Sequence, residues 1–408
     1  MEHGLRERVG GESEPLSDGA ADCRDHEHRE DDFEEHVEHE GRRYRHGVDE
    51  PGVAVEARAP GRVNLIGDHT DYTGGLVLPV AIDRWTTVRG VTGGSRVRLR
   101  SSAFAERADV PLPAPAAEVA RSRGPQVRPF AAGSASTASW TRYVAAVVEE
   151  FTPRTGFVGT VRSTVPVGAG LASSAALEVA LALAVGFTGD ADELAARCRR
   201  AEHRATGTPT GIMDQLIATR AVAGHASLID CRDRGIATIE LPPRDEVEIV
   251  VVHSGVGHEL ASSAYGRRVA ECERAAESIG PLRDASVDDV AGIVDPVIRA
   301  RARHVVTENA RVTRFVDAVR VGDLSAAGQC MVESHASLRD DYAVSVPAVD
   351  AIVEALCTAP GVFGARMTGG GFGGCVVALC RPDALASWGS RAWRVRAVGG
   401  AWVRRDAR

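Results

Sequence analysis

Residues 61–79 read GRVNLIGDHTDYTGGLVLP, and apolar runs flank the polar centre of this stretch on both sides. That pattern predicts a buried strand that ends in a polar turn. Within the turn, Asp68, His69 and Asp71 fall within four positions, a few residues after Arg62. Carboxylates accept hydrogen bonds from hydroxyl groups and an imidazole can accept or donate one, so the turn is suited to hold a small polyol. The alternative is a loop that is polar only because it is solvated.

Length and composition indicate a globular protein. The 408 residues suffice for two domains of ordinary size, and 44% of them are hydrophobic. The chain contains no run of eighteen or more apolar residues and its N-terminus is acidic, so we expect neither a membrane span nor a secretory signal. The eight cysteines form no CxxC pair. This favours a reduced, cytoplasmic protein and argues against a structural zinc site.

Charge is distributed unevenly along the chain. Residues 1–50 hold 17 acidic side chains against 7 arginines, and lysine is absent from the whole sequence. A phosphate loop of the form GxxxxGK[ST] is therefore excluded, and any phosphate site has to use backbone N–H groups, arginine and metal. The sequence has no basic stripe with interleaved aromatic residues, which argues against nucleic-acid binding. We expect residues 1–30 to be disordered, 31–46 to form a short helix and 105–137 to be loop-like.

A second informative stretch, VPVGAGLASSAALEVALALAV, covers residues 165–185. Glycines and small polar residues come first, and a run of helix formers follows, which predicts a loop that leads into a helix. Gly168 and Gly170 would let the backbone approach an anion, and the free N–H groups at the helix start favour negative charge. Ser173 and Ser174 add hydroxyl groups for a phosphate or Mg²⁺. The alternative is a tight strand-to-helix turn without a ligand.

Residues 192–219 read DELAARCRRAEHRATGTPTGIMDQLIAT and predict two helices around a GTPTG turn. Leu194 and Cys198 recur at helical spacing on one face. Glu202 lies near the end of the first helix, where the helix dipole disfavours an anion, so it either has a cation as partner or is solvated. Asp214 lies among apolar residues, which is costly unless the carboxylate has partners. It is therefore a functional candidate or a helix cap.

The last informative stretch, MTGGGFGGCVVALC, covers residues 367–380. Five of the six residues 369–374 are glycine, and a β-branched strand follows. Such a run marks backbone that packs very close to another loop or to a phosphate chain.

Together these stretches resemble the GHMP family of small-molecule kinases, and within it the galactokinase branch. The resemblance runs from about residue 54 to about 385, with the motifs in the family's order. It rests on five segments, which are GRVNLIGDHTDYTGGLVLP (61–79), PVGAGLASSAALEVA (166–180), AEHRATGTPTGIMDQ (201–215), HSGVGHELASSAYGRR (253–268) and MTGGGFGGC (367–375). It implies an α+β fold of two domains with the active site between them. We accordingly expect an N-terminal domain over 31–225 and a C-terminal domain over 226–408.

The resemblance also implies a reaction, the transfer of a phosphoryl group from ATP to the C1 hydroxyl of galactose with Mg²⁺ as cofactor. Asp214 would be the base and Arg62 would steady its charge and that of the phosphoryl group. The sugar-binding residues would be Asp68, His69, Thr70, Asp71 and Tyr265. The ATP-binding residues would be Ser101, Gly168, Ala169, Gly170, Leu171, Ala172, Ser173 and Ser174. Mg²⁺ would be held by Ser174 and Glu202.

Four departures from the galactokinase pattern are visible. Asp68 stands where the family has glutamate, and its reach is shorter by roughly 1.5 Å, which would affect KM or sugar choice. Ala172 replaces a serine and Thr210 a cysteine, and we expect small effects from both. After about residue 385 the chain reads ASWGSRAWRVRAVGGAWVRRDAR, in which the helix and final strand typical of the family have no clear equivalent. Without a covering strand, the second domain would expose a sheet edge.

Two rival functions remain open at this point. One is a GHMP kinase for another sugar, such as N-acetylgalactosamine, galacturonate or a pentose. The other is a non-catalytic sensor of galactose and ATP, although such relatives tend to lose phosphate-loop residues that this chain keeps. In each case the expected partners are a small sugar and ATP, with no nucleic acid and no membrane, and the chain is expected to be a monomer or a weak homodimer.

Overall fold

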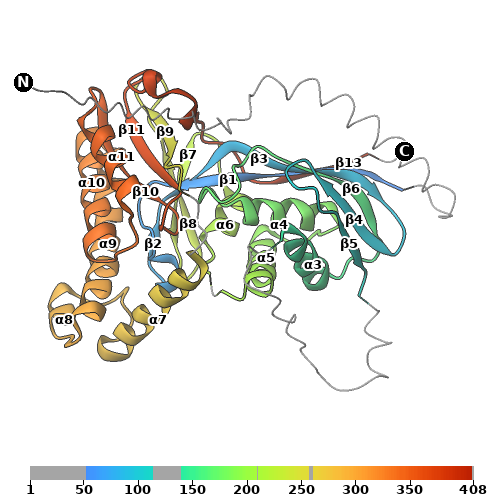
Figure 1. The fold of residues 1–408 in the computed structure, drawn as a ribbon, viewed down its shortest axis with the longest axis horizontal. Helices are drawn as coiled ribbons and strands as arrows, with labels where there is room; N and C mark the ends of the chain where they lie inside the picture. Colours follow the sequence, from blue (N-terminus) through green and yellow to red (C-terminus); the bar gives the residue numbers. More distant parts are fainter. Residues whose placement is uncertain (1–51, 114–138, 209, 257–260, 407–408) are drawn as a thin grey trace, which may run out of the picture. The chain divides into compact units, whose positions relative to one another are not determined.

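The buried strand predicted to lead into the polar turn is β1, which runs from Ala54 to Asn64 and lies at the centre of the fold (Figure 1). The structure, a computed structural model, describes residues 52–113, 139–208, 210–256 and 261–406. All of these belong to a single compact unit. The predictions for residues 1–30 and 31–46 lie outside the described residues.

β1 belongs to a six-stranded sheet with the order β13-β1-β3-β6-β4-β5. Its pairs are antiparallel except β4 with β6, which is parallel. The other strands are β3 (Pro79–Thr92), β4 (Arg96–Ser101), β5 (Ala108–Pro111), β6 (Phe157–Ser163) and β13 (Trp402–Asp406). β5 corrects the expectation of a loop over 105–137, of which residues 114–137 lie outside the described residues.

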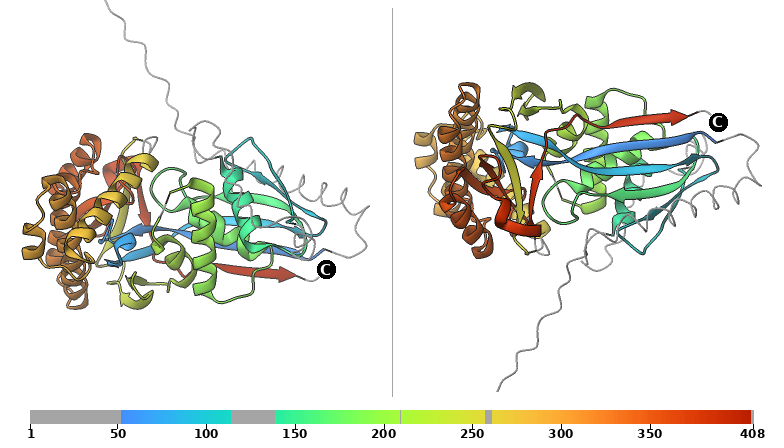
Figure 2. Two further views of the ribbon diagram at one scale, coloured as in Figure 1. Left: turned by 90° about the horizontal axis from the view of Figure 1, so that it is seen from below. Right: turned by 90° about the horizontal axis from the view of Figure 1, so that it is seen from above.

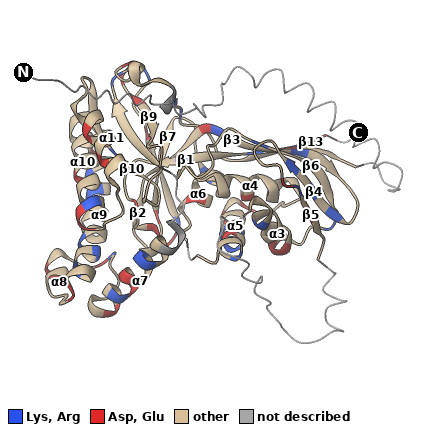
Figure 3. Ribbon diagram, in the orientation of Figure 1, with Lys and Arg blue, Asp and Glu red and all other residues tan. Residues whose placement is uncertain are grey.

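One face of this sheet is covered by helices, as Figure 2 shows. They are α3 (Trp140–Phe151), α4 (Ser173–Ala184), α5 (Ala191–Thr206) and α6 (Met213–Arg220). α4 packs against β1 and β3 and carries a single charged residue, Glu178, so it is almost free of charge in Figure 3. An apolar helix of this kind can be buried on all sides. Its N-terminal end is consequently fixed by the core of the fold.

The C-terminal half supplies a four-stranded sheet with the order β10-β11-β9-β12, and a small sheet has the order β2-β7-β8. Their strands are β2 (Leu76–Val77), β7 (His225–Asp230), β8 (Gly235–Glu240), β9 (Glu248–His253), β10 (Val362–Thr368), β11 (Cys375–Cys380) and β12 (Ala392–Val395). The helices of this half are α7 (Ala261–Ile279), α8 (Val287–Ala291), α9 (Pro296–Arg320), α10 (Leu324–Asp340) and α11 (Pro347–Thr358). The α+β class predicted from the sequence is confirmed. Across the described ranges, no helix combines the length and the apolar character that crossing a membrane requires.

The end of the chain corrects one expectation. A 3₁₀ helix (Ala386–Arg391) leads into β12, which pairs with β9 and covers that edge of the four-stranded sheet. The chain then crosses to the six-stranded sheet, where β13 pairs with β1 (Figure 2). The C-terminal residues, which showed no clear equivalent of the usual final elements, thus form one short helix and two strands.

Candidate active site

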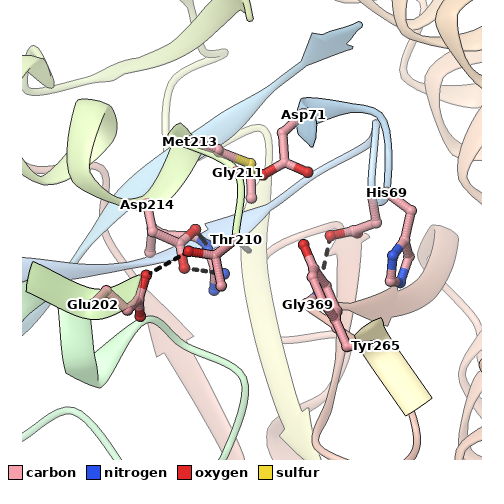
Figure 4. A pocket seen from close by; sticks show the side chains of 12 residues that line it. His69, Asp71, Glu202, Thr210, Gly211, Met213, Asp214, Tyr265 and Gly369 are labelled. Atoms are coloured by element: carbon pink, nitrogen blue, oxygen red, sulfur yellow. Dashed lines mark hydrogen bonds and ion pairs between the residues drawn. The ribbon is translucent and has the colours of Figure 1, made fainter. Parts of the chain in front are cut away.

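Four of the five predicted site segments meet around one cavity of about 130 Å³. This is close to the ~150 Å³ of a cavity that holds a single six-membered ring. Asp214 and Glu202 lie on one side of it, and His69 and Tyr265 on the other (Figure 4). The lining residues are Arg62, Asp68, His69, Asp71, Glu202, Thr210, Gly211, Met213, Asp214, Tyr265, Gly369 and Gly370. Both halves of the sequence therefore contribute to the same cavity.

Arg62 and Asp214 form a two-pronged ion pair in the cavity wall. Nε of Arg62 donates to Oδ1 of Asp214 at 2.7 Å, and Nη2 donates to Oδ2 at 2.8 Å. Arg62 is buried on β1, and Asp214 lies in the first turn of α6. A guanidinium that binds both carboxylate oxygens fixes the plane of the carboxylate as well as its position.

Burial raises the pKa of Asp214, whereas the charge of Arg62 lowers it and the nearby Glu202 raises it further. The net direction is upward, so Asp214 binds a proton more readily than a solvated aspartate. A carboxylate whose pKa is moved towards neutrality is better matched to proton transfer at neutral pH.

The turn after β1 brings His69 and Asp71 to the cavity. His69 has a left-handed backbone with φ of 65°, and Asp71 begins a short 3₁₀ turn, Asp71–Thr73. Burial, followed by the charge of Asp214, raises the pKa of Asp71 to about 7. Its carboxylate lies against Gly211, where a Cβ atom would come within 1.5 Å of Oδ2 of Asp71. Residue 211 therefore has to be glycine for Asp71 to keep this position.

Thr70 was predicted to bind the sugar together with its neighbours. It is fully buried and does not line the cavity. Its hydroxyl lies 2.8 Å from the carbonyl oxygen of Gly67 and 2.7 Å from that of Leu76, to one of which it donates. Thr70 therefore holds the turn in shape and is not placed to contact a ligand in the cavity.

Asp68 has a partner that sequence analysis missed. Its Oδ2 lies 2.6 Å from Nη2 of Arg366, a fully buried side chain on β10. Oδ1 accepts a hydrogen bond from the backbone N–H of Gly369 at 3.2 Å. The shorter carboxylate at this position thus ties the turn to the C-terminal glycine loop. Arg366 directly precedes the MTGGG motif, and its charge in an apolar strand was the signal that could have identified it.

A second set of residues missed from the sequence lies on α9, under the turn. Nε2 of His304 lies 3.1 Å from the carbonyl oxygen of Asp68, Glu308 accepts the N–H of Gly67, and Asn309 accepts that of Leu76. Burial alone would raise the pKa of Glu308, but the positive charges around it, first that of Arg311, together with a hydrogen bond from Ser334 outweigh burial, and the result is a pKa of about 2. The four- and five-residue spacing of Glu308 and Asn309 from His304, in an otherwise amphipathic helix, was the available signal.

The glycine loop before α4 has the conformation expected of an anion-binding turn. Gly168 and Gly170 have φ of 69° and 76°, and Ala172, at the helix start, has φ of 59°. No side chain of the described residues caps α4 at this end. The side chains of Ala169 and Leu171 are buried, so only their backbone could contact a ligand.

The C-terminal glycine loop approaches the same place, because a Cβ at Gly369 would lie 2.9 Å from the carbonyl oxygen of Gly170. The close approach predicted for the MTGGG segment is thus to another loop. Ser101 ends β4 and, like the residues of the glycine loop before α4, does not line the cavity.

Glu202 lies in a network of oxygen and amide groups. Oε1 accepts from the hydroxyl of Ser174 at 2.8 Å, and Oε2 accepts from Thr210 at 3.0 Å and from Gln215 at 2.9 Å. Gln215 also donates to Glu178, whose pKa burial raises well above its usual value. Within the described ranges, no group of three or more His, Cys, Asp or Glu residues could hold a metal ion. Mg²⁺ often takes only one or two carboxylates and is otherwise held by phosphates and water. The convergence of Ser174 and Glu202 therefore fits such a site.

Comparisons with known proteins agree with this arrangement. The chain matches the description "galactokinase galactose-binding signature" over residues 43–90, "GHMP kinases N terminal domain" over 140–221 and "GHMP kinases C terminal" over 315–394. The first match contains the turn at Asp68–Asp71, and the second contains the glycine loop, Glu202 and Asp214. The third extends past residue 385 into β12.

Individual relatives cover most of the chain. The galactokinase of Bos taurus is 43% identical over 350 residues, which are 82% of this chain and 85% of that protein. The galactokinase of Chloroflexus aurantiacus is 42% identical over 350 residues, 80% of this chain and 84% of the other. The crystal structure of Lactococcus lactis galactokinase complexed with galactose superimposes with a TM-score of 0.73 at 27% identity, covering 86% of this chain and 95% of that one. With this identity over more than two thirds of its length, the chain belongs to the galactokinase family of GHMP kinases.

Proposed function

We propose that this chain transfers the terminal phosphoryl group of ATP to the C1 hydroxyl of galactose, with Asp214 as the base. The observation that carries the proposal is the Arg62–Asp214 ion pair in the wall of a cavity that Asp71 and His69 also line. A sugar in this cavity would have hydroxyl-binding groups on one side and a base on the other. The relatives' name and the bound galactose of the Lactococcus lactis structure support galactose as the sugar.

Asp214 would accept the proton of the attacking hydroxyl. Arg62 would keep the carboxylate in one orientation through its two N–H groups and would add positive charge near the phosphoryl group. In phosphoryl transfer the protein contributes mainly positioning and electrostatic stabilisation, so a fixed base and a fixed arginine account for much of what is needed.

ATP phosphates would lie at the glycine loop of residues 168–174 and the start of α4. The left-handed glycines and the uncapped helix start support this role, since N–H groups at a helix N-terminus attract anions. Ser174 and Glu202 would hold Mg²⁺, which neutralises phosphate charge when it is bound. Because the chain has no lysine, backbone N–H groups, arginine and metal would stabilise the phosphates in place of a P-loop lysine.

The test is galactose-dependent release of ADP by the full chain with Mg-ATP, compared with glucose, N-acetylgalactosamine, galacturonate and arabinose. We expect turnover on galactose at the ~1–100 s⁻¹ typical of kinases. Turnover on another sugar in place of galactose would favour the second candidate, a GHMP kinase of different sugar choice. The observation in favour of that candidate is Asp68, whose carboxylate is bound to Arg366 and Gly369. ATP binding without turnover on any sugar would favour the sensor.

A further inference from the structure

His69 presents one ring nitrogen to a chain of side chains beneath the turn and leaves the other without a partner. The residue is 5% exposed and lines the cavity (Figure 4). Nδ1 lies 3.1 Å from the hydroxyl of Tyr72. Nε2 makes no hydrogen bond of normal geometry with the described residues. A buried imidazole nitrogen without a partner costs free energy unless a ligand supplies one.

The contact at Nδ1 continues away from the cavity. Besides its contact with His69, the hydroxyl of Tyr72 is hydrogen-bonded to the hydroxyl of Tyr342. Sγ of Cys272 in turn lies 3.0 Å from the hydroxyl of Tyr342. We call Cys272, Tyr342 and Tyr72 the thiol–hydroxyl chain. Tyr342 is fully buried, and its ring centroid lies 4.8 Å from that of His69 and 4.6 Å from that of His304. The packing of Tyr342 between the two histidine rings therefore fixes the position of the thiol–hydroxyl chain.

Each member of this arrangement carries one proton at neutral pH. Burial raises the pKa of both tyrosines well above the usual value and that of Cys272 to about 11. Burial lowers the pKa of His69 to about 3, so its ring is neutral and has a single N–H group. With four protons and three contacts, one proton is left over, so four orders of the hydrogen bonds are possible. In only two of them does each tyrosine hydroxyl donate to another member of the arrangement, which leaves two orders to distinguish.

In the first order each group donates towards the histidine, from thiol to Tyr342, from Tyr342 to Tyr72, and from Tyr72 to Nδ1. The ring proton is then on Nε2. In the second order Nδ1 carries the proton, every bond is reversed, and the last one ends on sulfur. The first order pairs a phenol, the more acidic donor, with an imidazole nitrogen, the more basic acceptor. The second pairs a weaker N–H donor with a phenol oxygen. The sulfur end does not distinguish the two orders, since a thiol is both a weak donor and a weak acceptor.

The cavity agrees with a donor at Nε2, which has no hydrogen-bond partner among the described residues. The backbone of Gly370, which also lines the cavity, opposes the effect of burial on the pKa of His69 and so favours a proton on the ring as a whole. A donor on this side would complement the other groups of the cavity, since Asp71 and Asp214 are carboxylates that accept hydrogen bonds.

We propose that the thiol–hydroxyl chain fixes His69 in the tautomer protonated on Nε2, so that His69 donates a hydrogen bond to a hydroxyl oxygen of the sugar. Its three members are positioning residues, because they act on the ligand only through His69. The step from donor to sugar rests on the proposed function, whereas the tautomer itself is a property of the protein without ligand.

The tautomer can be read directly from the ring ¹⁵N shifts of histidine-labelled full-length protein without substrate. The protonated and unprotonated nitrogens of a neutral imidazole give well-separated signals, and those of His69 are assigned by their loss in His69→Asn. We expect the proton on Nε2, unchanged between about pH 6 and 8 because the ring does not titrate there. A proton on Nδ1 would overturn the proposal, whatever the protein's activity.

Two variants test the cause. Tyr72→Phe removes the donor to Nδ1, so we expect a mixture of tautomers, a galactose KM higher by ~3- to 10-fold and a kcat within ~2-fold. Cys272→Ser keeps a donor at the start of the chain, so the tautomer and KM should stay as in the wild type. Tyr143→Phe is the control for loss of a tyrosine hydroxyl, since Tyr143 packs in the core beside the six-stranded sheet and does not line the cavity. It should change neither readout.

The outcomes separate this inference from the proposed function. An Nε2 proton in a protein that turns over no galactose would refute the proposed function and leave the tautomer assignment intact. Galactose turnover in a protein with the proton on Nδ1 would support the proposed function and refute the tautomer assignment. If Tyr72→Phe folds and leaves both tautomer and KM unchanged, the thiol–hydroxyl chain does not control His69. If that variant does not fold, the wild-type spectrum still decides which tautomer His69 adopts, and a proton on Nδ1 there overturns the proposal.

Discussion

The carboxylate of Asp68 is paired with the buried guanidinium of Arg366 at 2.6 Å, so that the turn after β1 and the strand β10 are joined by an ion pair inside the protein. The side chain of Arg366 is 0% exposed and that of Asp68 is 4% exposed. Removal of one partner leaves the other as a buried, unpaired charge.

Arg366→Met should therefore destabilise the protein by about 3–5 kcal/mol, the usual cost of breaking a buried pair. The double variant Asp68→Asn/Arg366→Met should lose less than the sum of the single variants, because no charge is left behind. Urea unfolding measures both. Arg314→Met, which breaks an exposed pair with Glu333, is the control and should cost at most about 1 kcal/mol. Equal losses for Arg366→Met and the control would contradict the argument.

Asp214→Asn should lower turnover by ~10²–10⁴-fold, because the amide cannot take the hydroxyl proton. Arg62 can still donate to the amide oxygen, so ATP and galactose binding should persist. Steady-state kinetics and calorimetric titration separate the two. Asp192→Asn, at an exposed ion pair with Arg220, is the matched control and should be fully active. Retention of turnover within about threefold by Asp214→Asn would rule this residue out as the base.

The pKa of Asp71, raised to about 7 by burial and by Asp214, makes sugar binding sensitive to pH. The carboxylate is the better acceptor for hydroxyls, so the KM for galactose should fall as the pH rises through about 7. Asp71→Asn should remove this dependence and raise KM about ten- to a hundredfold at pH 8. A wild-type KM that is flat between pH 6 and 8 would show that Asp71 does not titrate in contact with the sugar.

Stability should change in the opposite sense. The folded pKa of Asp71 lies above its ordinary value of 3.8. Between these two values the unfolded chain releases a proton that the folded protein keeps, so this group's contribution to stability falls as the pH rises and is level above about 7. Asp71→Asn should therefore be more stable than the wild type at pH 8, and the difference should vanish near pH 4. Urea unfolding at both pH values checks the sign.

The parts of the site that could be predicted from the sequence are those whose residues lie close together in the chain. The glycine loop before α4 and the helix that carries Glu202 are local patterns, and both were predicted. Asp68 and Gly369 are 301 positions apart, and nothing near Asp68 in sequence identifies a partner in β10. The contacts of the Thr70 side chain could not be predicted for a related reason, because its hydroxyl lies against the carbonyl oxygens of Gly67 and Leu76, which only the folded turn brings together.

Gly211 gives a direct test of how closely the site is packed. Gly211→Ala would place a Cβ 1.5 Å from Oδ2 of Asp71, so Asp71 has to move away. A misplacement of about 1 Å can cost up to 10²-fold in an enzyme, and we expect kcat/KM for galactose to fall by ~10- to 100-fold. Gly399→Ala is the control, since the nearest atom to its Cβ would be at 3.8 Å. Full activity of Gly211→Ala would mean that Asp71 has no fixed role at this position.

The last two strands should be needed for stability. A chain that ends at residue 385 loses β12 and β13, which exposes the edges of β9 and β1 and removes the buried side chain of Val395. Burial of one valine contributes about 1.5–3 kcal/mol, so the melting temperature should fall by about 5 °C or more. The open edges should also promote aggregation. A chain that ends at residue 400 keeps β12 and loses only β13, so its melting temperature should lie between the two. If the chain ending at 385 melts with the full-length protein and stays monodisperse, the two strands contribute nothing to the fold, and their pairing with β9 and β1 is not what closes these sheets.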